Sequence, residues 1–204
     1  MIIRKLFKFE GSHIVRNCSS ERCSRNVHGH SYKVEVFLSS DCLDNAGMIM
    51  DFGLMQDFRA VVDAFDHSHI IWREDNSRYR EFFMQENERW ILSEFNPSAE
   101  ILSLIFFYFF DRIIKNTEFS NDEGKISVKS VRVHETDTGY AECNRKDFEM
   151  FLNQIGNKVI ISFSSALREF LPKTVLNVKR IIPPPRKLIK QDEYLNNLNL
   201  STHG

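Results

Sequence analysis

A chain of 204 residues with a formal net charge of −1 is long enough for one domain and has no surplus of basic residues to hold a phosphate backbone. This balance argues against a nucleic-acid-binding protein. The most apolar run, residues 101–110, is too short to span a bilayer, which argues against a membrane protein. Because no export signal is evident at the N-terminus, we expect a cytoplasmic protein whose four cysteines are free thiols.

Along the first 145 residues, alternation of apolar and polar residues predicts strands, and a period near 3.6 predicts helices. Asp51 is expected to cap the first helix, and Asn96 followed by Pro97 is expected to open the second. Polar loops are expected over 10–27 and over 73–88, the latter with a short helical stretch. In chain order, the predicted elements are strands over 2–9 and 28–38, a helix over 52–64, a strand over 89–95, a helix from 97 to about 115, and strands over 125–135 and 138–143.

The character of the sequence changes after residue 145. We therefore divide the chain into a domain over 1–145 and a C-terminal extension over 146–204, helical at first and then proline-rich and polar. A helix-like stretch over 147–171 leads to three prolines at 183–185, which cannot continue a helix. We expect the extension to pack at the surface of an oligomer rather than to cover a pocket.

Two histidines flank a glycine at the start of the second predicted strand. Because side chains alternate along a strand, His28 and His30 share one face. A third imidazole would complete a three-histidine site with one tetrahedral position left open, the pattern of catalytic zinc. His13 is the expected third ligand if the first two strands pair as a hairpin. Imidazole also suits copper, iron and nickel, and the motif alone also occurs on polar surfaces.

Several other residues carry groups suited to catalysis, each with a plainer alternative. Asp66 beside His67 is a candidate orienter and base, or the end of a helix. Cys23 is a candidate base or nucleophile near a bound cation, or an inert thiol. Glu135, at the end of a strand, can accept paired N–H groups from a heterocycle, or be a solvated strand end. Glu100 is favoured in the first turn of its helix by the helix dipole alone.

Six segments in one order resemble the 6-pyruvoyltetrahydropterin synthase and 6-carboxytetrahydropterin synthase family. The resemblance implies the tunnelling fold, an α+β fold in which a four-stranded antiparallel sheet carries two helices on one face. It also implies a homo-oligomer, a trimer or hexamer, with active sites between subunits. The segments are FEGSH (9–13), CSRNVHGHSYKVEV (23–36), GMIMDFG (47–53), FDHSHI (65–70), NPSAE (96–100) and VRVHETDTGYAEC (131–143).

The resemblance also implies roles for single residues. It implies a zinc ion as cofactor, a catalytic base upstream of the His-Gly-His motif, an Asp-His catalytic pair, and a pocket for a pterin ring. The zinc ligands would be His13, His28 and His30; the catalytic residues would be Cys23, Asp66 and His67; and the pterin-binding residues would be Glu135, Glu100 and Ser98.

The sequence departs from the family pattern in three places. Four residues separate Cys23 from His28, a spacing between those of the two branches, so Cys18 remains a competitor for the role of base. Ser98 stands where the family usually has threonine. The run SHII at 68–71 replaces a segment that usually carries asparagine.

The substrate implied by the resemblance is 7,8-dihydroneopterin triphosphate, and the enzyme would be a zinc-dependent carbon–carbon lyase. The segment ETDTGYAEC, residues 135–143, resembles bacterial members that serve queuosine biosynthesis. It favours a 6-carboxytetrahydropterin synthase, which releases acetaldehyde and triphosphate. The alternatives are a 6-pyruvoyltetrahydropterin synthase, which eliminates triphosphate, and a non-catalytic paralogue that binds a pterin or a metal. The complete catalytic set argues against the last alternative.

Overall fold

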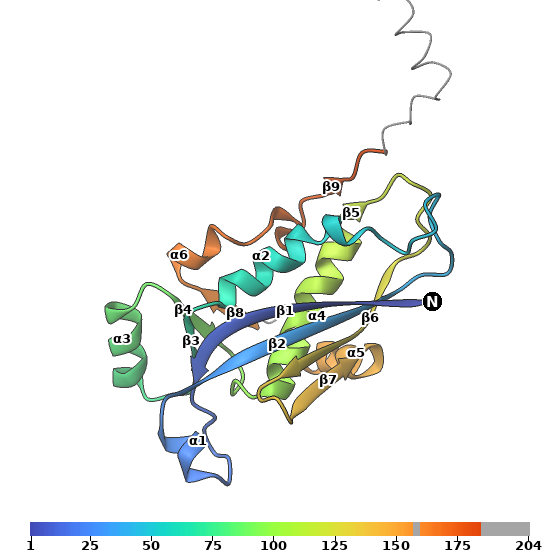
Figure 1. The fold of residues 1–204 in the computed structure, drawn as a ribbon. Helices are drawn as coiled ribbons and strands as arrows, with labels where there is room; N and C mark the ends of the chain where they lie inside the picture. Colours follow the sequence, from blue (N-terminus) through green and yellow to red (C-terminus); the bar gives the residue numbers. More distant parts are fainter. Residues whose placement is uncertain (157–159, 185–204) are drawn as a thin grey trace, which may run out of the picture.

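The computed structural model of the protein describes residues 1–156 and 160–184. Its centre is a long hairpin of β1 (Ile2–His13) and β2 (His28–Ser39), paired in register over their whole length (Figure 1). Beyond β2, the antiparallel strands β6 (Ser127–His134) and β7 (Tyr140–Asn144) continue the sheet. The order β7–β6–β2–β1 confirms the expected four-stranded antiparallel sheet.

Three further strands extend this sheet to seven in the described part of the chain. β3 (Ser68–Trp72) runs parallel to the end of β1, β4 (Trp90–Ser93) runs parallel to β3, and β8 (Ile161–Phe163) is antiparallel to β4. The sequence pattern does not predict a strand over 68–72. The four residues 68–71 are all buried, so this strand lacks the alternation that marks one with a single buried face. Two short strands, β5 (Thr117–Glu118) and β9 (Arg180–Ile181), pair separately.

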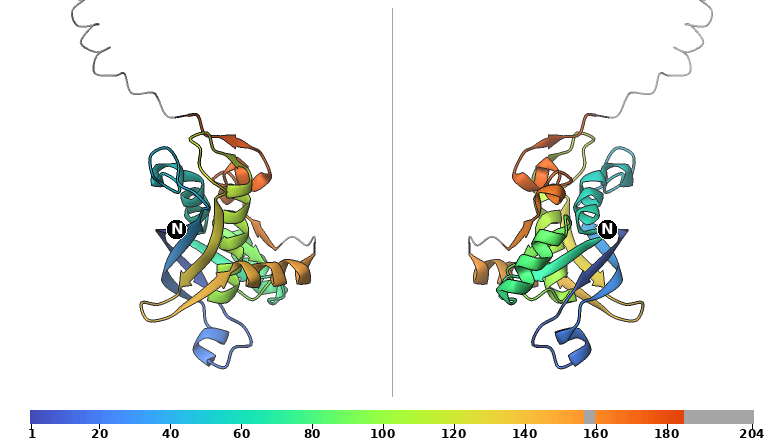
Figure 2. Two further views of the ribbon diagram at one scale, coloured as in Figure 1. Left: turned by 90° about the vertical axis from the view of Figure 1, so that its right-hand side faces the viewer. Right: turned by 90° about the vertical axis from the view of Figure 1, so that its left-hand side faces the viewer.

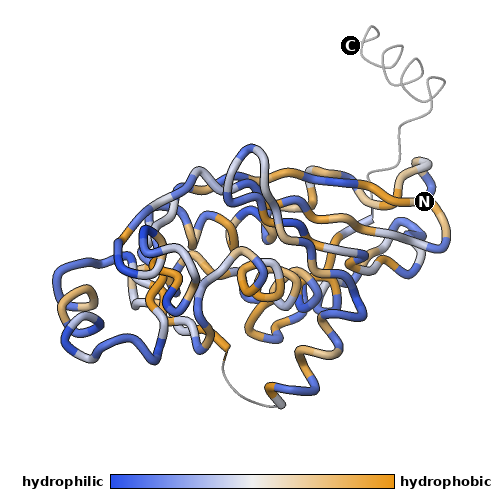
Figure 3. The backbone as a smooth tube through the Cα atoms, turned by 90° about the horizontal axis from the view of Figure 1, so that it is seen from below, coloured by the Kyte–Doolittle hydropathy of each residue, from blue (hydrophilic) through white to orange (hydrophobic). Residues whose placement is uncertain are grey.

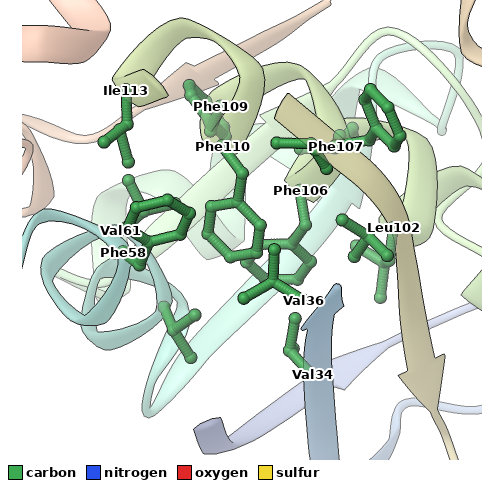
Figure 4. Packing of buried hydrophobic residues seen from close by; sticks show 14 of the residues in the cluster. Val34, Val36, Phe58, Val61, Leu102, Phe106, Phe107, Phe109, Phe110 and Ile113 are labelled. Carbon is green, nitrogen blue, oxygen red and sulfur yellow. The ribbon is translucent and has the colours of Figure 1, made fainter. Parts of the chain in front are cut away.

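Two helices cover one face of the sheet, as expected: α2 (Gln56–Phe65) lies against β1, and α4 (Ala99–Lys115) lies across β6 and β7 (Figure 2). Aromatic rings fill the space between them. Phe58 of α2 and Phe110 of α4 have ring centroids 4.9 Å apart, beside the valines of β2 (Figure 4). Hydrophobic segments accordingly gather in the interior, and hydrophilic ones in the outlying loops (Figure 3). No helix in the described ranges is long and apolar enough to cross a bilayer.

The boundaries of several elements differ from those expected. β1 continues to His13, and the segment expected as a loop contains the short helix α1 (Glu21–Arg25). Asp51 accepts a hydrogen bond from Gly53 N, but it caps the 3₁₀ helix η1 (Phe52–Leu54), which precedes α2. The polar segment 73–88 contains the ten-residue helix α3 (Ser77–Glu86).

The cap of α4 is also corrected. Ser98, rather than Asn96, is its N-cap, and its hydroxyl accepts from Ile101 N. The Asn96 side chain instead bonds both the N–H and the carbonyl of Arg16, and thereby ties the loop after β1 to the start of α4.

The stretch expected as one helix over 147–171 is interrupted. Helix α5 (Arg145–Ile155) ends at Gly156, whose positive φ of 58° suits a glycine, and the chain then forms β8, α6 (Ser165–Arg168) and the 3₁₀ helix η2 (Lys173–Leu176). Phe148, Phe163 and Leu167 join the same hydrophobic core as α2 and α4. The division at residue 145 stays a prediction, and the expected polar end after Pro185 lies outside the described residues.

Candidate active site

Three imidazoles meet at the end of the β1–β2 hairpin. The register places His13 opposite His28, and His30 two residues further along the same face of β2. One ligand nitrogen from each of the three lies within 4.8 Å of the others. The close approach of the strands needs Gly29, because a Cβ there would lie 3.0 Å from the carbonyl oxygen of Gly11. The hairpin therefore brings the predicted ligands together.

The hydrogen bonds of this cluster suit a metal ion. His13 Nδ1 lies 2.7 Å from the Pro97 carbonyl oxygen, and His28 Nδ1 lies 3.0 Å from that of Asn26. Because a carbonyl only accepts, both Nδ1 atoms carry hydrogen, which leaves a lone pair on each Nε2; the Tyr32 hydroxyl lies 3.3 Å from the Nε2 of His13. His30 Nε2 is the one buried side-chain nitrogen or oxygen in the described part that has no hydrogen-bond partner. This donor set fits zinc.

Burial favours the neutral form of His13 and His30, the form that binds metals. Burial lowers the pKa of His13 to about 4. The hydrogen bond to Pro97 opposes this shift by raising the pKa, and the neighbouring histidines lower it further. Burial also lowers the pKa of His30. Glu135 Oε1 lies 3.4 Å from His13 Nε2 and 3.8 Å from His30 Nε2, so this carboxylate borders the cluster.

A cleft of about 420 Å³ opens beside the histidines, and most of the other residues predicted for the active site line it. Cys23, on α1, lines this cleft; α1 lies below the hairpin in Figure 1. Cys18 lines it from the loop before α1. Both thiols are half-buried. Residues at the start of α4 and just after β6 also line it. Predicted residues that line the cleft are Cys18, Cys23, His28, His30, Ser98, Glu100 and Glu135.

The Asp66–His67 pair lies elsewhere, at a second cleft of about 740 Å³ that His67 and His30 line. Asp66 Oδ2 lies 2.8 Å from His67 Nδ1, and Asp66 Oδ1 accepts from Glu10 N. Burial alone would raise the pKa of Asp66, but these hydrogen bonds hold it below its usual value. The side chain of His67 is 73% exposed. Within one chain, the pair and Cys23 therefore open into different clefts, and His30 borders both.

A buried histidine beside the second cleft has no role in the sequence analysis. His69 Nδ1 lies 2.8 Å from Ser12 Oγ, and its Nε2 lies 2.6 Å from the hydroxyl of Tyr79. Burial lowers the pKa of His69 to about 4. The one feature of the sequence that draws attention to His69 is the departure from the family pattern at 68–71. This departure does not indicate that Ser12 and Tyr79 are its hydrogen-bond partners.

The fold and the histidine cluster together define a tunnelling-fold protein with a candidate metal centre. Two solved structures share the fold over 71% of this chain and 98% of their own: an uncharacterized protein from Wolinella succinogenes (TM-score 0.56, 21% identity) and a 6-pyruvoyltetrahydropterin synthase from Plasmodium vivax (TM-score 0.50, 18% identity). At such identities they show the fold alone.

Sequence similarity gives the family. A family model described as 6-pyruvoyl tetrahydropterin synthase matches residues 2–146. A Helicobacter pylori protein named 6-carboxy-5,6,7,8-tetrahydropterin synthase is 48% identical over 150 residues, 73% of this chain and 75% of the relative. An Aquifex aeolicus protein of the same name is 32% identical over 158 residues, 69% of this chain and 95% of the relative. The chain belongs to the 6-pyruvoyl tetrahydropterin synthase family.

Proposed function

We propose that the protein is a 6-carboxy-5,6,7,8-tetrahydropterin synthase of queuosine biosynthesis. It converts 7,8-dihydroneopterin triphosphate and one water to 6-carboxytetrahydropterin, acetaldehyde and triphosphate. The observation that carries this proposal is the 48% identity over 150 residues to a relative of that name. The histidine cluster and its cleft supply a site of suitable chemistry. We place the enzyme in the cytoplasm.

The proposed cofactor is a zinc ion held by His13, His28 and His30. When bound, zinc supplies a Lewis acid that acidifies the side-chain hydroxyls of the substrate. The protein contributes three imidazoles, two of them oriented by backbone carbonyls. The half-buried position of His30 limits the water that reaches the ligands.

The cleft residues provide the remaining roles. Cys23 is the general base that removes a proton from the substrate side chain, because its side chain lines the cleft beside the histidines. Glu135 accepts paired N–H groups from the pterin ring. Ser98 and Glu100 line the cleft at the first turn of α4 and complete the pterin contacts.

The proposed active site lies between subunits of a trimer or hexamer. This explains why His67, which is bonded to Asp66, lines a different cleft from Cys23 within one chain. His67, oriented by Asp66, then delivers or removes a proton at the cleft of a neighbouring subunit. The exposure of the His67 side chain agrees with a partner on the neighbouring chain.

Mixing two inactive variants tests this arrangement. We expect Cys23→Ala and Asp66→Asn each to lose turnover. Their co-assembled oligomers should regain roughly a quarter of wild-type turnover, because one interface in four brings an intact Cys23 together with an intact Asp66. The measurement is turnover of oligomers formed by co-expression with different tags. Mixed oligomers that stay as inactive as their parents would place both groups in one chain's site.

Product analysis tests the reaction. Zinc-loaded protein given 7,8-dihydroneopterin triphosphate should form acetaldehyde and 6-carboxytetrahydropterin in equal amounts, measured by trapping the aldehyde and by mass spectrometry of the pterin. A pyruvoyl product without acetaldehyde would assign the protein to the other branch of the family. Tight pterin binding with no product would identify a non-catalytic paralogue.

A further inference from the structure

The turn that carries the Asp66–His67 pair is held by an arginine more than twenty residues further along the chain. Arg89, just before β4, donates from Nε and Nη2 to the Asp66 carbonyl oxygen at 2.9 and 2.6 Å, and from Nη2 to that of Asp63 at 3.0 Å. The next residue, His67, has a positive φ of 53°, a conformation that persists in a non-glycine residue only where its surroundings determine it. Arg89 is therefore part of what fixes the direction of the His67 side chain.

Arg89 is in turn held by the segment after residue 146. Ser164 Oγ donates to the Glu88 carbonyl oxygen at 2.6 Å, and Ser164 N donates to that of Trp90 at 3.1 Å. The residues on both sides of Arg89 are thus bonded to one buried serine. The Arg89 guanidinium also lies over the ring of Phe170, 5.5 Å from its centroid. Ser164 and Phe170 both belong to residues 161–170, here called the β8–α6 segment, which joins the sheet through the pairing of β8 with β4 (Figure 1).

We infer that the β8–α6 segment of the C-terminal extension positions the Asp66–His67 pair through Arg89. The inference rests on the proposed catalytic role of that pair. Packing alone would be served by the pairing of β8 with β4 and by the burial of Phe163 and Leu167. Packing does not require two nitrogens of the Arg89 guanidinium, the arginine fork, to bond the carbonyl oxygen of Asp66. It also does not require an aromatic ring that is 54% exposed to lie against this guanidinium.

The test removes the two supports without emptying the core. Phe170→Leu keeps an apolar side chain but removes the aromatic ring under the guanidinium, whereas Phe170→Tyr keeps the ring. Arg89→Lys keeps the positive charge but removes the paired N–H donors of the guanidinium. Leu176→Ala is the matched control, because Leu176 is an exposed apolar residue of the same extension, 64% exposed, on η2. Each full-length variant is measured for kcat, KM, bound zinc and melting temperature.

We expect kcat to fall about threefold in Phe170→Leu and tenfold or more in Arg89→Lys, because a misplaced acid–base group slows the chemical step. Zinc content and KM should stay within about twofold of wild type in both, since the zinc site and the pterin cleft are untouched. Phe170→Tyr and Leu176→Ala should match wild type.

Two results would overturn the inference. The first is wild-type kcat in Phe170→Leu, with or without a loss in Arg89→Lys, while Asp66→Asn is inactive; the pair would then keep its catalytic role, but the C-terminal segment would not position it. The second is a rise in KM at unchanged kcat in Arg89→Lys, which would make Arg89 a substrate ligand. Wild-type turnover by Asp66→Asn would refute the role of the pair itself, and the inference with it.

Discussion

Replacing Cys23 by alanine should reduce kcat at least about 100-fold, the range expected when a general base is lost, while Cys18→Ala stays within about threefold of wild type. Both thiols line the cleft beside the histidines. Cys23 is favoured because its α1 position is anchored: the Cys23 N–H donates to Ser20 O, and its carbonyl oxygen accepts from Val15 N. The Cys18 thiol instead lies 3.3 Å from Ser20 O, which it can bond as a donor.

The measurement is steady-state turnover of 7,8-dihydroneopterin triphosphate by each single variant, with bound zinc determined on the same samples. Zinc content should remain at the wild-type level in both, because neither sulfur belongs to the group of three ligand nitrogens. A large loss in Cys18→Ala with activity retained in Cys23→Ala would exchange the two assignments.

Replacing His13 by glutamine should weaken zinc binding more than about 100-fold, because even the loss of an outer hydrogen-bond partner of a ligand typically costs 10- to 100-fold. His13 is the fully buried member of the cluster and links it to α4 through the Pro97 carbonyl oxygen. Turnover should fall below detection at limiting zinc. The measurement is competition for zinc against a chromophoric chelator, together with turnover.

His69→Gln is the matched control for this substitution. His69 is also buried and its pKa is also lowered to about 4, but it bonds Ser12 and Tyr79 and lies outside the group of three ligand nitrogens. It should lose stability without losing zinc. Equal loss of zinc from His69→Gln and His13→Gln would mean that the first result reports general unfolding rather than a missing ligand.

Much of the metal site could be predicted from sequence because it depends on a local rule. Alternation places His28 and His30 on one face, and pairing of adjacent strands brings His13 opposite. The sequence also predicts strands that the structure contains at 28–39, 127–134 and 140–144. These strands have one buried face, so their sequences alternate between apolar and polar residues and can be recognised as strands.

The remaining features depend on contacts between distant segments. β3 is buried on both faces and shows no alternation, and β8 interrupts what reads as one helix because it can pair with the edge of β4. Ser98 replaces Asn96 as the cap of α4 because the Asn96 side chain is engaged by the backbone of Arg16, 80 residues earlier. The separation of Asp66 from Cys23 likewise follows from tertiary structure, since β3 joins the sheet on the far side of β1.

The central claim is that the histidine cluster holds zinc and that this zinc supports an acetaldehyde-releasing lyase reaction. The most direct test measures acetaldehyde formation from 7,8-dihydroneopterin triphosphate as zinc is added back to metal-free protein. We expect the rate to rise in proportion to bound zinc and to level off at one ion per chain. Protein that carries one zinc per chain and forms no acetaldehyde, or that forms it equally well without metal, would contradict the account.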